Sequence, residues 1–353
     1  MELLDVVPGP AFVPLAPRPE MLRPVKKYMG GVPKCMTYLT EVPWVFHLFR
    51  DIAKPTVFVA PPALVELIGW ATAFENSCRH CYGAQRAMMR ILGHSDEWIA
   101  RVERDATLAD VDPQQRGVLD LARKLARSNP RPARAEREAL TAQYGAAAAV
   151  ELAYVVTGWC FTTRVATFLR LPPDPELERL PDRWFLPVVR PLLRWMLRKP
   201  AHRPEVLPLD GPFYPIIAPM GEVAAAHVLR RAIDGALASP VLPRRAKLLV
   251  FAVVARSLPC TTTEAEACRL LAAEGLDAAQ VDEILRNLGS AALDPLETLL
   301  VTFARASVRY DHLEVQDRVG RDLVPKLSAP ELIEATAVAA LANSIARMAM
   351  FAA

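Results

Sequence analysis

The chain repeats itself at a distance of 182 residues, and this period constrains the fold more than any other feature of the sequence. Landmarks of the first half recur in the same order in the second half: Pro61, Cys78, Gly93 and Asp112-Pro113 correspond to Pro243, Cys260, Gly275 and Asp294-Pro295. With one residue of slippage, Arg164 corresponds to Arg347. This period is too long for a solenoid repeat. The sequence therefore predicts a tandem domain duplication, rather than two unrelated bundles rich in Ala and Leu.

Helical signals dominate both halves. Ala, Leu, Arg and Glu recur in long runs, without the alternation that is typical of half-buried strands. Helices are expected over 97–107, 115–128, 134–141, 145–170, 222–238, 244–257, 263–273, 278–288, 295–308 and 330–351. Of the 32 prolines, 23 lie in 1–62 and 172–219, where they mark approaches to the two halves. We expect an all-α fold with tandem domains over 1–171 and 215–353, joined by a Pro-rich linker over 172–214.

Composition limits the compartment and the partners. The net charge of +3, from 42 basic and 39 acidic residues, gives no support for a nucleic-acid partner. The N-terminus carries Glu2 and Asp5 and lacks a basic region, so it is a poor signal peptide. The apolar stretches 145–169 and 335–353 contain charged residues, which cost about 2.5–3.5 kcal/mol each inside a bilayer. We expect both stretches to be buried core helices and the protein to be cytoplasmic.

The linker contains a basic amphipathic segment over 183–200. It carries Trp184 and Trp195, together with arginines at 190, 194 and 198 that are spaced four apart. Such a segment can lie on a membrane surface. Pro187 and Pro191 are expected to interrupt a continuous helix, however. The favoured interpretation is a linker docked on the two domains, without membrane contact.

The one constellation that carries chemistry is Cys78-Arg79-His80-Cys81. Asn76 and Ser77 are good N-cap candidates, which would place both cysteines in the first turn of the next helix. Exposed backbone N–H groups and the positive end of the helix dipole stabilise a thiolate there. The basic residues Arg79, His80 and Arg86 add positive charge. Because cysteines three apart share a helix face, the pair can form a reversible disulfide.

Besides a redox dithiol, the pair is compatible with two other interpretations. A structural zinc site commonly uses two such pairs, and only one is present here. Alternatively, the two cysteines are buried and inert. Three of the remaining cysteines are expected to be small buried apolar residues: Cys35, Cys160 and Cys268. Cys260 is the one member of the constellation that the second half keeps. No metal, flavin or nucleotide motif is present, so no cofactor is expected.

At these residues the sequence resembles the alkylhydroperoxidase-D-like / carboxymuconolactone-decarboxylase-like family. The redox branch of that family carries Glu, eleven residues, Cys-x-x-Cys, three residues and His. Here Glu66 is followed by eleven residues and then by Cys78 and Cys81. The lead-in over 30–49 and the continuation over 91–95 are also similar. The resemblance covers 28–170 well and 215–353 weakly, and the family histidine is replaced by Gln85.

The resemblance implies that Glu66 and the residue at 85 relay a proton, that Cys81 attacks a peroxide and that Cys78 closes the disulfide. The position of the cysteines at a helix start equally favours Cys78 as the thiolate. Gln85 can hydrogen-bond but cannot titrate, and His80 is the only nearby imidazole. An unbroken helix would hold Glu66 about 18 Å from Cys78. The relay therefore needs the chain to turn at 75–77.

The second half has lost this constellation. At the shift of 182, Leu248, Thr263 and Ala267 stand where the first half has Glu66, Cys81 and Gln85. The second half is therefore expected to be a structural copy. The resemblance implies a homo-oligomer, in which a trimer of this two-domain chain resembles a hexamer of single domains.

The leading functional hypothesis is a thiol-dependent peroxidase or disulfide oxidoreductase that acts on a hydroperoxide or a disulfide and is reset by a dithiol protein. The alternatives are a cofactor-free lyase on the same fold and a non-enzymatic oligomerisation or binding module.

Overall fold

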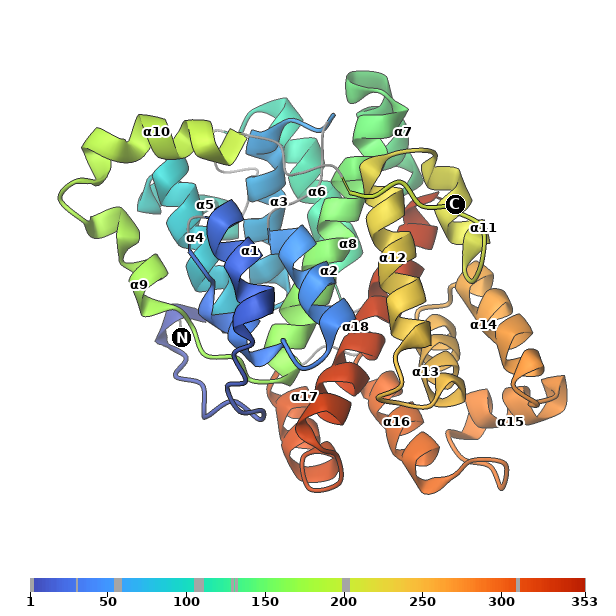
Figure 1. The fold of residues 1–353 in the computed structure, drawn as a ribbon. Helices are drawn as coiled ribbons and strands as arrows, with labels where there is room; N and C mark the ends of the chain where they lie inside the picture. Colours follow the sequence, from blue (N-terminus) through green and yellow to red (C-terminus); the bar gives the residue numbers. More distant parts are fainter. Residues whose placement is uncertain are drawn as a thin grey trace.

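The computed structural model describes residues 3–29, 31–53, 59–104, 111–127, 130, 133–198, 204–308 and 312–352, and these residues form helices and loops without a strand (Figure 1). The all-α prediction is thus confirmed. In the first half the helices are α1 (Pro19–Met29), α2 (Pro43–Ala53), α3 (Pro62–Glu75), α4 (Arg79–Leu92), α5 (Asp96–Arg104), α6 (Pro113–Ala126), α7 (Arg134–Tyr144) and α8 (Ala146–Phe168).

The linker holds α9 (Pro175–Glu178) and α10 (Leu186–Arg198). The remaining helices are α11 (Tyr214–Ile217), α12 (Ala224–Ala238), α13 (Arg244–Ser257), α14 (Thr261–Ala273), α15 (Ala278–Asn287), α16 (Pro295–Ala306), α17 (His312–Arg318) and α18 (Ala329–Ala352). Shorter 3₁₀ turns lie at Leu3–Asp5, Lys34–Tyr38, Leu180–Asp182 and Ala218–Met220, and a π-helical turn covers Val319–Leu323.

The repeated landmarks lie at helix ends. Asp112 and Asp294 are N-caps whose carboxylates accept backbone N–H bonds of 2.7 and 2.8 Å, and a proline follows each of them. Gly93 and Gly275 follow α4 and α14 with φ of 105° and 86°, where glycine avoids the steric penalty of a side chain. The landmarks recur because they set where helices begin and end.

Helix bounds recur at the same period. The first and last residues of α3 and α13 differ by 182, and α8 and α18 begin 183 residues apart. The carboxylate of Glu151 on α8 accepts the N–H of Ala60 at 2.9 Å, just before α3. At the corresponding positions, Glu334 on α18 accepts the N–H of Leu242 at 2.7 Å, just before α13. These parallels support the predicted duplication.

The two halves share one core. Helices α8 and α18 pack side by side at the centre of the molecule, and buried apolar residues run without a break through both halves (Figure 1). Contacts also cross between the halves, since Trp44 Nε1 on α2 donates to Glu334 at 2.8 Å and Gln316 on α17 donates to the Thr167 carbonyl at 3.0 Å. The two halves therefore pack together as the tandem copies of a fused pair would, while the domain boundaries at 171 and 214 remain a prediction.

Among the described residues, α8 and α18 are long and apolar enough to cross a membrane, but their most apolar windows are 83% and 89% buried inside the protein. Both are core helices, as the charges within them indicated. Arg347 illustrates how such a charge is accommodated: its side chain is fully buried and donates to the carbonyls of Leu125 at 2.8 Å and Arg127 at 3.0 Å.

The linker packs mainly against one side of the first half. Helices α9 and α10 both contact α4, and α10 also contacts α3. The expected interruption of α10 does not occur, because Pro187 lies in the first turn, where its missing N–H has no helical partner. Because Pro191 has no N–H, only the Pro187 carbonyl lacks its helical hydrogen bond. Both prolines lie at exposed positions, where water can donate a hydrogen bond to that carbonyl.

Candidate functional site

The chain turns between α3 and α4, as the proton relay requires. Asn76 is the C-cap of α3 and Ser77 adopts a left-handed φ of 48°. The Cys78 N–H donates to the Ala73 carbonyl at 3.1 Å, which closes the turn. The Asn76 amide donates to Thr163 Oγ1 on α8 at 2.9 Å and so ties the turn to the core.

The N-cap of α4 is Cys78, not Asn76 or Ser77 as the sequence suggested. Its backbone is extended (φ −81°, ψ 99°), and its sulfur accepts the N–H of Cys81 at 3.3 Å. The reason for the difference is that Asn76 and Ser77 are still part of the turn that ends α3. Cys81 thus lies at the third helical position, directly above the Cys78 sulfur, and both thiols are free.

The two thiols have opposite acidities. Burial alone would raise the pKa of Cys78, but hydrogen bonds from the thiol and N–H of Cys81, the Thr167 hydroxyl and the His80 N–H outweigh it, so the pKa lies below its ordinary value. Burial, and then the neighbouring Cys78 sulfur, hold the pKa of Cys81 well above its ordinary value. The arrangement stabilises a thiolate on Cys78 and a neutral thiol on Cys81.

The basic residues around the pair do not supply the expected positive charge. Arg79 makes a two-pronged pair with Glu178 of α9 at 2.6 and 3.0 Å, and Arg86 pairs with Asp96 at 2.7 Å. Burial lowers the pKa of His80, whose Nδ1 donates to the Pro172 carbonyl at 2.6 Å. The expectation is wrong because these side chains are held by partners distant in sequence. The thiolate depends on hydrogen bonds instead.

Both sulfurs lie under a cover. Cys78 is 1% exposed and Cys81 3% exposed. The cover consists of the N-terminal segment, which accepts the Arg79 Nε–H at the Leu4 carbonyl, and of the linker, which is held through Pro172 and Glu178. Gly83 lets the linker approach, because a Cβ at that position would collide with the Glu178 carboxylate. A substrate must therefore be small, or the cover must move.

A third thiol lies near the pair. Cys35, in the turn Lys34–Tyr38, is 4% exposed, and its charge would interact unfavourably with that of Cys78 and Cys81. Burial, followed by Asp174, raises its pKa to about 12, so it stays a neutral thiol. Cys160 is also buried, and its sulfur receives a weak bond from Asn76 at 3.9 Å. Both are buried as expected, but no sequence pattern indicates that Cys35 adjoins the pair.

Glu66 lies on α3 with a partly buried side chain, and no hydrogen bond or ion pair connects it to any other described residue. Burial raises the pKa of this carboxyl to about 7. A carboxyl that titrates near neutrality can both give and take a proton at physiological pH. Neither thiol contributes to the shift, so the structure shows no direct electrostatic contact between Glu66 and the dithiol.

Gln85 and Trp159 face the turn of α3 that follows Glu66. The point where a Cβ on Gly69 would lie is 3.0 Å from Gln85 Oε1 and 2.8 Å from Trp159 Nε1. In the described part of the chain neither of these buried atoms has a hydrogen-bond partner, and the same holds for Trp70 Nε1 and Thr72 Oγ1. Buried polar atoms are rarely left unpaired, so the two that meet at Gly69, and the two further ones on α3, indicate a requirement other than stability.

The second half provides an internal comparison for this interface. Leu248, Ala252, Val254, Ala267 and Ala342 occupy the positions of Glu66, Trp70, Thr72, Gln85 and Trp159. Every polar group is thus replaced by an apolar one. Cys260 and Thr263 keep the local geometry, since the Cys260 N–H donates to the Ala255 carbonyl at 2.9 Å and the sulfur lies 3.2 Å from Thr263 Oγ1. The polar interface is specific to the first half, and position-by-position comparison of the halves could have identified Trp70, Thr72 and Trp159.

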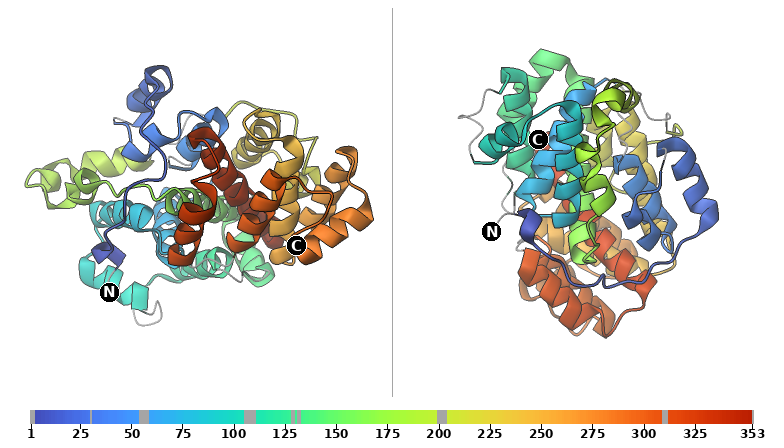
Figure 2. Two further views of the ribbon diagram at one scale, coloured as in Figure 1. Left: turned by 90° about the horizontal axis from the view of Figure 1, so that it is seen from below. Right: turned by 90° about the vertical axis from the view of Figure 1, so that its left-hand side faces the viewer.

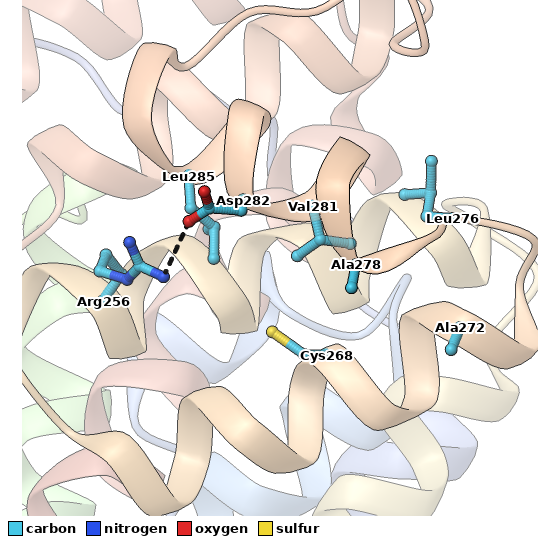
Figure 3. A pocket seen from close by; sticks show the side chains of 8 residues that line it. All are labelled: Arg256, Cys268, Ala272, Leu276, Ala278, Val281, Asp282 and Leu285. Atoms are coloured by element: carbon cyan, nitrogen blue, oxygen red, sulfur yellow. Dashed lines mark ion pairs between the residues drawn. The ribbon is translucent and has the colours of Figure 1, made fainter.

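Cys268 differs from the other cysteines. It is partly exposed and lines a cavity of about 220 Å³ between α14 and α15, with Arg256 and Asp282 at one end and apolar residues along the rest (Figure 3). The expectation that it is a small buried residue is wrong, because the two helices leave a gap beside it. This cavity lies in the second half, on different helices from the dithiol.

The chain matches no protein-family model, no curated protein and no solved structure. Within the described residues, no group of three or more His, Cys, Asp or Glu side chains is placed to hold a metal ion. The site is therefore defined by its own geometry.

Proposed function

We propose that this protein is a dithiol oxidoreductase that reduces a hydroperoxide at Cys78 and Cys81. The observation that carries the proposal is the sulfur of Cys78 at the N-cap of α4, which accepts the Cys81 N–H at 3.3 Å while its pKa is lowered by hydrogen bonds. A thiolate is the nucleophilic form of cysteine. The likeness of the Glu66-to-dithiol spacing to the alkylhydroperoxidase-D-like family supports the same assignment.

The cycle has three steps. The Cys78 thiolate attacks the distal peroxide oxygen, the O–O bond breaks, and the departing alkoxide takes a proton and leaves as an alcohol, while Cys78 becomes a sulfenic acid. The Cys81 thiol then attacks the Cys78 sulfur, which forms the disulfide and releases water. A reduced dithiol protein finally transfers two electrons and two protons to the disulfide and becomes oxidised itself.

We assign the proton for the departing alkoxide to Glu66. Its pKa of about 7 keeps a large fraction protonated at neutral pH, and it lies one turn from the Gln85 and Trp159 polar atoms. Gln85 cannot titrate, so it takes the part of a fixed hydrogen-bonding group. Glu66→Gln is expected to lower peroxide turnover at least tenfold without changing disulfide formation by an external oxidant.

The decisive experiment combines peroxide turnover, with a small dithiol as the donor, and mass spectrometry after brief exposure to sub-stoichiometric peroxide. Cys81→Ser should trap a sulfenic acid on Cys78, whereas Cys78→Ser should yield none and abolish turnover. Cys268→Ser is the matched control and should retain full turnover. A sulfenic acid found only on Cys81, in Cys78→Ser, would reassign the attacking thiol. Full turnover in both single variants would overturn the proposal.

A second candidate is a cofactor-free lyase with Glu66 as its general acid or base. The raised pKa of this unpaired carboxyl favours it independently of the thiols. Its activity would survive replacement of both Cys78 and Cys81 and would be lost in Glu66→Gln. A purely structural module, by contrast, would show neither a low-pKa thiol in titration nor a readily formed disulfide.

We also propose that the chain assembles as a trimer. The central α8–α18 packing has the character of a fused dimer, and the resemblance implies that six such domains assemble together. Light scattering on the purified protein tests this, because a mass near that of one 38.9-kDa chain would contradict it.

A further inference from the structure

Helix α10 and the turn directly before it carry an exposed apolar stripe, which we name the α10 stripe: Trp184, Val188, Leu192 and Trp195. These side chains are 88%, 79%, 55% and 55% exposed. The spacing of Val188, Leu192 and Trp195 places these three along one side of the helix, and Trp184 lies in the turn that precedes it. Isolated exposed apolar residues are ordinary, but a continuous row with two tryptophans marks a binding surface.

The stripe is exposed because α10 is held by its other side. Leu186 is fully buried, and α10 packs against α4 and α3. The helix lies at the periphery and projects from the edge of the molecule in two perpendicular views (Figures 1 and 2). The stripe therefore faces solvent from a fixed platform and is accessible to a large, flat partner.

The charge of this segment is one-sided. Residues 183–198 contain four arginines and no acidic residue, although the whole chain is almost balanced at +3. Arg183 is exposed beside Trp184. Arg190, Arg194 and Arg198 follow at intervals of four, so the sequence of this segment is positively charged along its length. The complementary partner is extended, negatively charged and able to accept apolar side chains.

We propose that the α10 stripe docks on the surface of an anionic lipid bilayer, with α10 parallel to the membrane. Tryptophans prefer the headgroup level, Val188 and Leu192 would enter the acyl boundary, and the exposed Arg183 would meet lipid phosphates, while the other arginines of the segment add long-range attraction to an anionic surface. A symmetric contact with a second copy would instead bring two sets of arginines together, which is unfavourable. This inference does not depend on the proposed peroxidase activity and departs from the sequence expectation of a linker without membrane contact.

The test is co-sedimentation of the full chain with vesicles of phosphatidylserine and phosphatidylcholine in equal parts, compared with phosphatidylcholine alone. We expect binding to the anionic vesicles only, and a decrease with added salt because screening weakens attraction to the surface. Val188→Ser/Leu192→Ser should lower the partition coefficient at least tenfold, since each apolar side chain adds about tenfold when buried. Arg183→Glu/Arg194→Glu should lower it by a similar factor.

Matched controls change the same residue types elsewhere. Leu15 and Val206 are 52% and 75% exposed away from α10, so Leu15→Ser/Val206→Ser should bind as the wild type does. Arg101→Glu/Arg116→Glu, at exposed positions on α5 and α6, should also retain most of the binding. Absence of binding to anionic vesicles, or equal losses in the control variants, would overturn the proposal. So would a change of mass in light scattering for Val188→Ser/Leu192→Ser, which would identify the stripe as a contact between copies.

Discussion

The partly buried carboxyl of Glu66 should make the stability of this protein depend on pH in a way that a single substitution removes. Burial raises the pKa of Glu66 from an ordinary value of 4.5 to about 7 in the folded state. Between these values the folded protein keeps a proton that the unfolded chain has released, so stability falls as the pH rises. At 1.36 kcal/mol per pKa unit, the loss amounts to about 3 kcal/mol above pH 7, and this is an upper value because the side chain retains some contact with solvent.

Glu66→Gln keeps the shape and removes the ionisation. The variant should be more stable than the wild type by up to about 3 kcal/mol at pH 8, and this difference should shrink towards zero near pH 4.5. Urea unfolding followed by circular dichroism across this pH range measures the difference directly. Glu205→Gln, at an exposed position, is the control and should show no such trend. A difference between wild type and Glu66→Gln that stays constant from pH 5 to pH 8 would refute the reasoning.

Three further predictions follow from described contacts. Gly83→Ala should displace the Glu178 carboxylate and raise the rate at which a thiol reagent labels Cys78 at least tenfold, and an unchanged rate would show that the linker does not limit access. Glu334→Gln should destabilise the fold by about 3–5 kcal/mol in urea unfolding, because the pair with Lys247 at 3.2 Å is fully buried and burial already lowers the pKa of that lysine. Thr72→Val, which copies Val254 of the second half, should stabilise the protein by about 1 kcal/mol by the same assay, because it removes a buried hydroxyl without a partner.

The sequence predicted helices well wherever end signals are local. The helix expected over 244–257 is found as Arg244–Ser257, and the one expected over 278–288 is found as Ala278–Asn287, whose N-cap Asp277 forms a capping box with Gln280. Helix α10 was expected to be broken because Pro191 lies inside it. Its exposed surroundings let water satisfy the carbonyl that the proline leaves free, which sequence patterns do not reveal.

The residues of the candidate site could be predicted from the sequence, but the contacts that surround them could not. Cys78, Cys81 and Glu66 could be selected from spacing alone. Their electrostatics depends on contacts between residues far apart in sequence. Glu178 forms an ion pair with Arg79, and the Thr167 hydroxyl, at the end of α8, forms a hydrogen bond with Cys78. Such contacts arise only when the helices pack, so a local pattern cannot show them.

The shared α8–α18 core has a consequence for how the two halves can change over evolutionary time. If the chain descends from a symmetric pair of identical subunits, a substitution in that ancestor appeared at both sites at once. After fusion each copy could diverge alone, and the second half now has Leu248, Val254 and Ala267 where the first has polar residues, although the corresponding helices are present in both. If the first half is the catalytic one, as we propose, the second was free to act as a structural support for it. The linker is present only once per chain, so the surface that it forms has no symmetry-related counterpart.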